Sequence, residues 1–187
     1  MSWIQLRSGG KFDFENPDRS TWTIPDIAWG LAHITRFNGQ SDKPLTVAQH
    51  SINVSYLVPA EQALAALFHD AAEAFIGDIT TPMKLMLGGK FALLEHAVEA
   101  EIFGKLNLNP YTKEIKHADL VCLATERLLL FKTLRPEPWD CLKDIHPLVD
   151  ADYGNDWSLF DIGGNDHPGI AYHRFMKRYE ELLHATK

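Results

Sequence analysis

The sequence predicts an all-α protein with a small β-hairpin at its N-terminus. Apolar residues recur at helical spacing through most of the chain, and Gly or Pro residues stand where these stretches begin or end. Only the first fourteen residues show the weak alternation that is typical of short strands. The length of 187 residues suits about one domain. We therefore expect a single domain with one helical core.

The expected elements follow in chain order. Two short runs on either side of the Gly9-Gly10 turn indicate the hairpin. Helices are expected over residues 24–38, 44–57, 61–75, 82–87, 91–106, 110–133 and 171–184, with one short helix near 139–143. The single domain, 1–187, then divides into a hairpin and loop (1–20), a helical core (21–133) and a loop-rich segment with a terminal helix (134–187).

Composition and charge restrict the function. Lys and Arg number 18 and Asp and Glu number 25, which gives a net charge of −7. This charge argues against polymeric nucleic acid as a partner, because phosphate backbones attract clustered basic side chains. The two Cys residues and the lack of a long apolar run favour a cytoplasmic protein with no membrane partner. Nine His residues direct attention to metal binding.

Groups that are costly to bury concentrate in one predicted helix. His69 and Asp70 directly follow the apolar stretch 63–68, and a helix so apolar is normally buried on most sides. A carboxylate in that setting should be neutralised, paired or bound to a metal. Glu73 lies four residues after His69 and would share its helix face, and Asp78 follows the predicted helix end. These residues are candidates for one polar pocket.

His50 and Asp119 would complete a metal site from the neighbouring predicted helices. Mixed imidazole and carboxylate ligands suit Zn, Mn, Fe, Co or Ni. An isolated His-Asp pair on a helix is more often a hydrogen-bonded pair in the core. The further acids and the second imidazole, each on an apolar helix or at its end, favour the metal site here.

The same residues carry a resemblance to a known family. The order His50, His69-Asp70, Asp119 resembles the H…HD…D signature of the HD superfamily of metal-dependent phosphohydrolases. The stretch FHDAAEAFIGDITTPMK resembles deoxynucleoside 5′-monophosphatases and phage HD deoxynucleoside triphosphohydrolases, which share the pattern HD-x-x-E-x-x-x-x-D-x-x-x-P-x-K. Residues 33–37, 47–51 and 118–127 fit the same group, so the resemblance covers about residues 20–132. The interval between His50 and His69 is short for this group, which would trim a loop near the substrate.

The resemblance implies an HD-domain helical bundle with one divalent metal ion, which could be Zn, Mn, Co, Ni, Fe or Mg. The implied metal ligands are His50, His69, Asp70 and Asp119. Glu73 would orient or deprotonate the attacking water, and Asp78 would assist the leaving group or hold a second ion. The metal would offset part of the negative charge that an anionic substrate meets.

Four further residues are candidate substrate contacts. The planar guanidinium of Arg36 suits bidentate contact with a phosphate, and Lys84 is a second phosphate candidate. Phe37 could stack on a base or sugar, although an aromatic at helical spacing is more often a core residue. His33 is either a contact near the substrate or a hydrogen-bonded core histidine.

The resemblance implies hydrolysis of (deoxy)nucleotides, with a small-molecule nucleotide as the partner. Few basic residues accompany Arg36 and Lys84, which favours removal of phosphate from nucleoside 5′-monophosphates. The alternatives are a deoxynucleoside triphosphate triphosphohydrolase such as a phage dATPase-like enzyme, an HD-type di-iron oxygenase and a non-catalytic nucleotide-binding module. The oxygenase would need further ligands, for which only His96 and His117 lie in the right interval. The apolar helices are compatible with a homo-oligomer.

Overall fold

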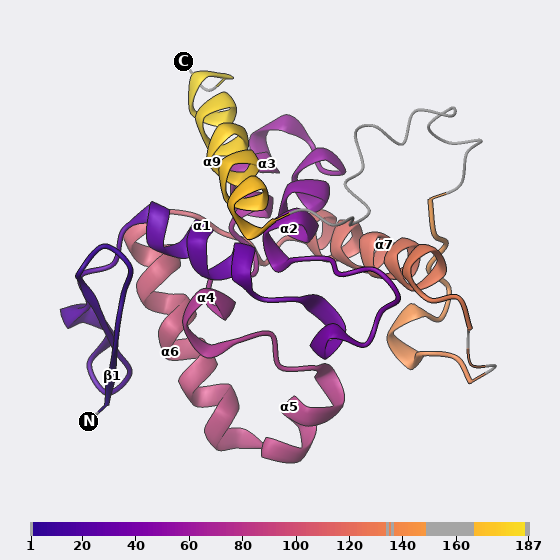
Figure 1. Ribbon diagram of the computed structural model, residues 1–187, viewed down its shortest axis with the longest axis horizontal. Coiled ribbons are helices and arrows are strands. Elements are labelled where there is room, and N and C mark those ends of the chain that lie inside the picture. The colour runs from indigo at the N-terminus through magenta and orange to yellow at the C-terminus, as the bar shows by residue number, and fades with distance from the viewer. Residues whose placement is uncertain (1, 134, 136, 149–166, 186–187) are drawn as a thin grey trace.

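A computed structural model describes residues 2–133, 135, 137–148 and 167–185 of the chain. Within these residues, the strands β1 (Trp3–Gln5) and β2 (Lys11–Asp13) form an antiparallel hairpin. The only other strand-like pairing in the described segments is one isolated bridge. Helices make up most of the rest, so the predicted all-α fold with an N-terminal hairpin is confirmed (Figure 1). Part of the predicted loop-rich segment, residues 149–166, lies outside the described residues.

As far as residue 130, the helices follow one another with short connections. In chain order they are α1 (Ile24–His33), α2 (Val47–Tyr56), α3 (Ala63–Leu67), α4 (Glu73–Ile76), α5 (Thr81–Leu87), α6 (Gly89–Leu106), α7 (Lys113–Leu130) and α9 (Pro168–Ala185). Short 3₁₀ turns occupy Pro17–Arg19, Arg36–Gly39, Ala60–Gln62 and Asp140–Leu142. No helix of the described segments is long and apolar enough to cross a membrane.

Helix α2 lies at the centre of the molecule. It packs against α1, α3, α7 and α9, and its residues from Val47 to Ser55 are all buried. Its start is fixed by a capping box, in which the Thr46 hydroxyl accepts a hydrogen bond from the Gln49 amide and the Gln49 side chain accepts one from the Thr46 amide. A polar side chain on this helix therefore points into the protein interior from a fixed backbone.

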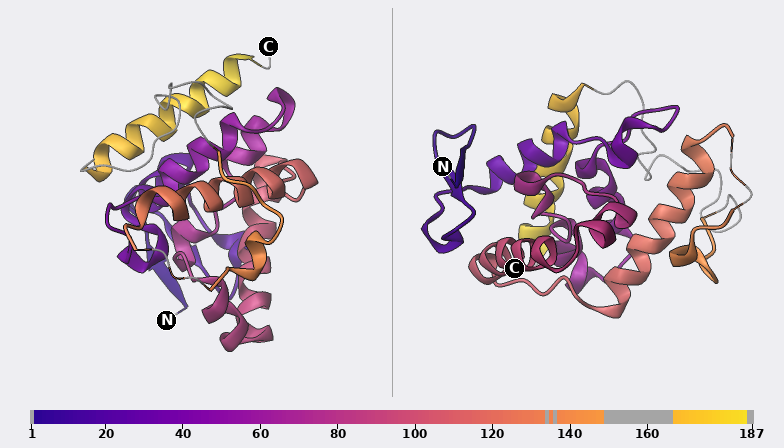
Figure 2. Two further views of the ribbon diagram at one scale, coloured as in Figure 1. Left: turned by 90° about the vertical axis from the view of Figure 1, so that its right-hand side faces the viewer. Right: turned by 90° about the horizontal axis from the view of Figure 1, so that it is seen from below.

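The other elements surround α2 in recognisable positions. Helix α9 lies across the outside of α1 and α2, while the hairpin and α7 lie at opposite ends of the molecule (Figures 1 and 2). The hairpin joins the core through Phe12, whose ring stacks on Phe75 with 4.2 Å between centroids. Helices α1 and α4 come close at Gly30, where an added Cβ would lie 2.8 Å from the Ala74 carbonyl oxygen. A side chain larger than that of glycine would not fit between α1 and α4 at this position.

The predicted helix 24–38 is wrong in its second half. Helix α1 ends at His33, and Thr35 instead pairs with Thr46 in an isolated antiparallel bridge. The Arg36 amide donates to the Leu45 carbonyl, which stabilises this extended segment. Consecutive β-branched residues favour extended backbone, and tertiary pairing decides the outcome here. Arg36 therefore reaches the interior from a 3₁₀ turn and not from a helix.

The predicted helix 61–75 is also interrupted. Residues 68–72 form turns between α3 and α4, with hydrogen bonds from residue i to residue i−3, such as Glu73 amide to Asp70 carbonyl. Residues three apart are eclipsed in such tight turns, whereas an α-helix aligns residues four apart. The expectation that His69 and Glu73 share a regular helix face is therefore wrong, although both lie at the pocket described below.

Candidate metal centre

Two imidazoles and two carboxylates from three elements converge in the interior. His50 lies on α2, His69 and Asp70 lie in the turn after α3, and Asp119 lies on α7. The His50 Nε2 atom lies 3.3 Å from Asp119 Oδ1 and 3.6 Å from Asp70 Oδ2, and His69 Nε2 lies 3.2 Å from Asp70 Oδ2. Ligand atoms of His50, His69 and Asp119 all lie within 4.8 Å of one another. The residues that the sequence suggested as metal ligands are thus brought together.

The hydrogen bonds of both imidazoles leave their Nε2 atoms open. His50 Nδ1 donates to Glu126 Oε1 at 2.6 Å, and His69 Nδ1 donates to the Ala66 carbonyl at 2.8 Å. Both Nε2 atoms are fully buried and have no hydrogen-bond partner in the described part of the chain. Buried polar atoms normally find a partner, so two unpartnered imidazole nitrogens facing the same carboxylates indicate a site for a cation.

Helix α7 supplies its acids by simple helical geometry. The Thr112 hydroxyl caps this helix by accepting from the Ile115 amide. Glu126 follows Asp119 by seven residues, which is about two turns, so both acids face α2. His117 is two residues from Asp119 and lies on the exposed side of the helix.

Neighbouring charges shift the pKa values of the cluster residues away from their ordinary values. Burial and the Arg36 guanidinium oppose a charge on His50, but Glu126 and Asp119 outweigh them and raise the pKa of His50 to about 9. Burial would raise the pKa values of Asp70 and Asp119, but the two imidazoles lower both. In the absence of a metal, a proton on His50 therefore supplies part of the positive charge that the carboxylates require.

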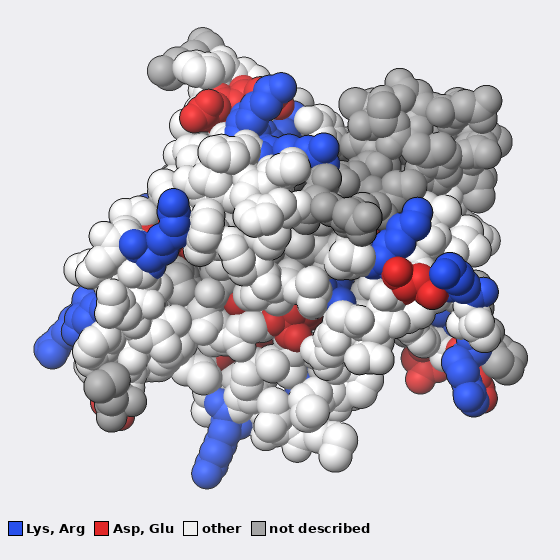
Figure 3. Space-filling model, viewed as in Figure 1, with Lys and Arg blue, Asp and Glu red and all other residues white. Residues whose placement is uncertain are grey.

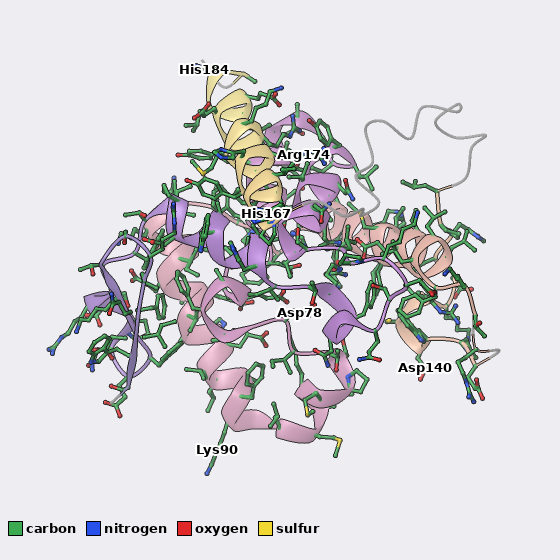
Figure 4. The ribbon with its side chains drawn as sticks, viewed as in Figure 1. Asp78, Lys90, Asp140, His167, Arg174 and His184 are labelled. Carbon is green, nitrogen blue, oxygen red and sulfur yellow. The ribbon has the colours of Figure 1, made fainter. Side chains whose placement is uncertain are left out.

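Glu73 and Asp78 lie beside this cluster. Glu73 is buried at the start of α4, and its Oε2 atom has no hydrogen-bond partner among the described residues. Burial raises the pKa of Glu73 well above its ordinary value, with Asp70 and Asp78 adding to the effect. Burial also raises the pKa of Asp78. Acidic atoms form the floor of a hollow in the middle of one face, in the region where Asp78 lies (Figures 3 and 4).

Arg36 reaches the same cluster and is buried. Its Nε donates to Glu126 Oε2 at 2.9 Å, and its Nη1 lies 3.8 Å from Asp70 Oδ2. Burial opposes the charge on the guanidinium, but the surrounding carboxylates of Glu126 and Asp70 outweigh it and raise the pKa of Arg36. Arg36 is therefore a permanently charged group at the edge of the proposed ligand set.

The remaining candidate substrate residues are engaged in other contacts. Lys84 on α5 donates to Glu95 Oε1 at 2.6 Å. Phe37 has a left-handed backbone, with φ of 58°, and its ring contacts those of Phe131 and Trp139. His33 is exposed at the end of α1, and its Nδ1 donates to the Trp29 carbonyl.

Two further residues contact the cluster and were not among the candidates from the sequence. Glu126 has no role in the expectations drawn from the sequence, yet it is fully buried and contacts both His50 and Arg36. Its seven-residue spacing from Asp119 was the available signal. Lys116, whose Nζ lies 2.7 Å from Asp119 Oδ2, was missed because an exposed lysine on a helix is seldom informative.

The fold and the site define a helical protein with a buried cluster of imidazole and carboxylate groups that could hold a metal ion. No family model matches the chain. Over its whole length it is 34% identical to the uncharacterized protein YfdR of Escherichia coli (strain K12), of which the alignment covers 99%. It is also 34% identical over 139 residues, 67% of its length, to the uncharacterized protein RCAP_rcc00048 of Rhodobacter capsulatus, of which 71% is covered. The chain belongs to the family of YfdR.

Proposed function

We propose that this protein is a metal-dependent phosphohydrolase that removes phosphate from nucleoside 5′-monophosphates. The observation that carries the proposal is the pair of buried, unpartnered Nε2 atoms of His50 and His69, which face the carboxylates of Asp70 and Asp119. This arrangement follows the H…HD…D order of the phosphohydrolase superfamily that the sequence resembles. The choice of nucleoside 5′-monophosphates as the substrate class rests on that resemblance.

The donor set fits a divalent metal ion. Neutral imidazole and carboxylate are suitable ligands for Zn, Mn, Fe, Co or Ni, and each imidazole has its Nδ1 hydrogen fixed by an acceptor that leaves Nε2 available. His50, His69, Asp70 and Asp119 would hold the ion. When bound, the ion would polarise a phosphoryl oxygen and increase the acidity of a water molecule.

The remaining polar residues would divide the work of hydrolysis. Glu73 is buried beside Asp70, and its raised pKa makes it a stronger base than an ordinary carboxylate, as removal of a proton from water requires. Asp78, also with a raised pKa, would donate a proton to the leaving alcohol. The guanidinium of Arg36, charged at all ordinary pH values, would hold the phosphate.

The cations near the site favour a substrate with one phosphate. Arg36 and Lys84 both interact electrostatically with the pocket acids, but Lys84 is held by Glu95 in the adjoining helix. A triphosphate carries more charge than these two cations would offset. Deoxynucleoside triphosphate triphosphohydrolysis is therefore the second candidate. The oxygenase alternative is weaker, because the candidate extra ligands His96 and His117 are both exposed and outside the ligand group.

A nucleotide panel with separated products tests the proposal. The protein is loaded in turn with Mn²⁺, Co²⁺ or Zn²⁺ and incubated with deoxynucleoside and ribonucleoside monophosphates and triphosphates. We expect orthophosphate and nucleoside from at least one monophosphate, and no reaction with the metal chelated. Release of triphosphate without orthophosphate would favour the second candidate. A metal-loaded protein that cleaves none of these would contradict hydrolysis of nucleotides.

A further inference from the structure

We infer that Glu126 is a positioning residue that holds a metal ligand and the phosphate-binding arginine in one fixed arrangement. Each oxygen of its carboxylate has a different partner: Oε1 accepts from His50 Nδ1 at 2.6 Å, and Oε2 accepts from Arg36 Nε at 2.9 Å. The carboxylate is fully buried on α7. This inference rests on the proposed function, because it assigns His50 and Arg36 the roles given there.

The contact to His50 sets which imidazole nitrogen is available. A carboxylate can only accept hydrogen bonds, so in neutral His50, the form that binds a metal, Glu126 keeps the hydrogen on Nδ1 and the lone pair on Nε2. The Nε2 atom is the one that lies 3.3 Å from Asp119 Oδ1 and 3.6 Å from Asp70 Oδ2. Glu126 thereby fixes both the tautomer and the ring orientation that a metal ligand needs.

The contact to Arg36 orients the guanidinium toward Asp70, one of the proposed metal ligands. With Nε held by Glu126, the Nη1 atom lies 3.8 Å from Asp70 Oδ2. The planar guanidinium has a fixed geometry, so anchoring Nε also determines where its two terminal nitrogens point. One carboxylate thus relates the position of a phosphate bound by Arg36 to that of an ion bound by His50.

A purely structural ion pair between Glu126 and Arg36 is the alternative. Such a pair would stabilise the fold, and its loss would leave a buried charge without its partner. It would not require the contact between Glu126 Oε1 and His50. The two explanations therefore differ in whether a change at Glu126 alters metal affinity in protein that remains folded.

The test substitutes Glu126→Gln, which keeps the shape of the side chain. An amide has one acceptor oxygen, so its NH₂ group must face one of the two donors, His50 Nδ1–H or Arg36 Nε–H. Co²⁺ affinity is measured by competition with a chromophoric chelator, and the visible spectrum of bound Co²⁺ is recorded. We expect affinity to fall about 10–100-fold, the usual cost of losing a group that orients a metal ligand. We also expect the Co²⁺ spectrum to change.

Thr125→Val is the matched control. Thr125 is also fully buried on α7, and its hydroxyl donates to the Val121 carbonyl and accepts from the Leu148 amide, away from the ligand set. This variant should lower the melting temperature of the metal-free protein without changing Co²⁺ affinity or spectrum. Glu126→Asp keeps the charge with a shorter side chain and should bind Co²⁺ with an affinity between those of Glu126→Gln and the wild type.

The outcomes separate this inference from the proposed function. Wild-type Co²⁺ affinity in folded Glu126→Gln would overturn the inference, even if the wild type hydrolyses nucleotides. Weakened Co²⁺ binding in that variant would support it, even if no nucleotide is cleaved. If Glu126→Gln does not fold, ¹⁵N NMR of His50 in the Zn²⁺-loaded wild type decides. A hydrogen on Nδ1 with the metal on Nε2 supports the inference, and the reverse overturns it.

Discussion

Two polar clusters in this protein differ in how completely their side chains are hydrogen-bonded. Asp26, on α1, accepts hydrogen bonds from the amide and hydroxyl of Ser8 and from the amide and hydroxyl of Thr23, at 2.7 to 2.9 Å. The other cluster leaves Nε2 of His50 and of His69 without partners among the described residues, although carboxylates are close by.

The difference indicates what each cluster is for. The donors around Asp26 come from the hairpin turn and the helix cap, so this carboxylate fastens the N-terminal segment to α1 and has no capacity for a ligand. In the second cluster, the Nε2 atoms of the two imidazoles face carboxylates without a hydrogen bond of their own, an arrangement that costs free energy unless a proton or a metal ion lies between them. The cluster around Asp26, in which the carboxylate is fully hydrogen-bonded, is the closed cluster and stabilises the fold. The cluster around His50 and His69, which has unpartnered nitrogens, is the open cluster and is suited to binding.

Replacing a ligand of the open cluster should have the largest effect. In His69→Ala we expect loss of metal binding, by more than the roughly 100-fold that loss of an orienting contact costs, together with loss of hydrolysis. The metal-free variant should remain folded with some loss of stability, because His69 donates to the Ala66 carbonyl and favours the ionised form of Asp70. Calorimetric metal titration and thermal melting in chelator check both statements. Retained metal binding would contradict the open-cluster interpretation.

A change at Glu73 should separate catalysis from metal binding. Glu73→Gln removes the base but preserves the volume, so we expect the rate of hydrolysis to fall about 10²–10⁴-fold. Metal stoichiometry should remain unchanged, because Glu73 is not among the proposed ligands. Initial rates at saturating nucleotide and metal analysis of the same sample provide the measurements. An unchanged rate would remove Glu73 from the proposed mechanism.

Metal affinity should depend on pH through His50. Its pKa is raised from 6.5 to about 9 in the metal-free protein, so protonated His50 stabilises that form below pH 6.5, and this contribution is lost as the pH rises through 9. A metal ion must displace the proton, and its affinity should rise about tenfold per pH unit up to pH 9 and then level off. Calorimetry at several pH values in buffers of different ionisation enthalpy measures the released proton. Affinity independent of pH would contradict this account.

A substitution in the closed cluster should lower stability and leave metal binding unchanged. Asp26→Asn places an amide NH₂ among hydroxyl and amide donors, and we expect the free energy of unfolding to fall by about 1–3 kcal/mol. Burial opposes the ionised form, yet the Thr23 and Ser8 donors lower the pKa of Asp26, so its stabilisation is present above the unfolded-state pKa and decreases in acid. Urea unfolding should show the loss, while metal affinity stays at the wild-type value. A large change in metal affinity would show that the two clusters are coupled.

The sequence predicted the fold class and the grouping of the proposed ligands more accurately than the backbone conformation around those ligands. Helical periodicity and the hairpin turn are local signals, and the chemistry of His50, His69, Asp70 and Asp119 limited how they could be buried. The turn at 68–72 depends on tertiary packing, which periodicity does not report.

The two contacts of Glu126 could not be predicted for a similar reason. Its partners His50 and Arg36 lie 76 and 90 residues away in the sequence. The bend that brings Arg36 inward comes from the pairing of Thr35 with Thr46, which contradicts the predicted helix. Contacts between distant segments decide this part of the site.

Metal stoichiometry tests the central claim most directly. The protein is stripped with chelator, titrated with Co²⁺ in a calorimeter and then analysed for bound metal, alongside His69→Ala. The open cluster predicts one tightly bound ion per wild-type chain and none in the variant. A folded wild-type protein that binds no divalent ion, or a variant that binds one equally well, would contradict the assignment of this cluster as a metal centre.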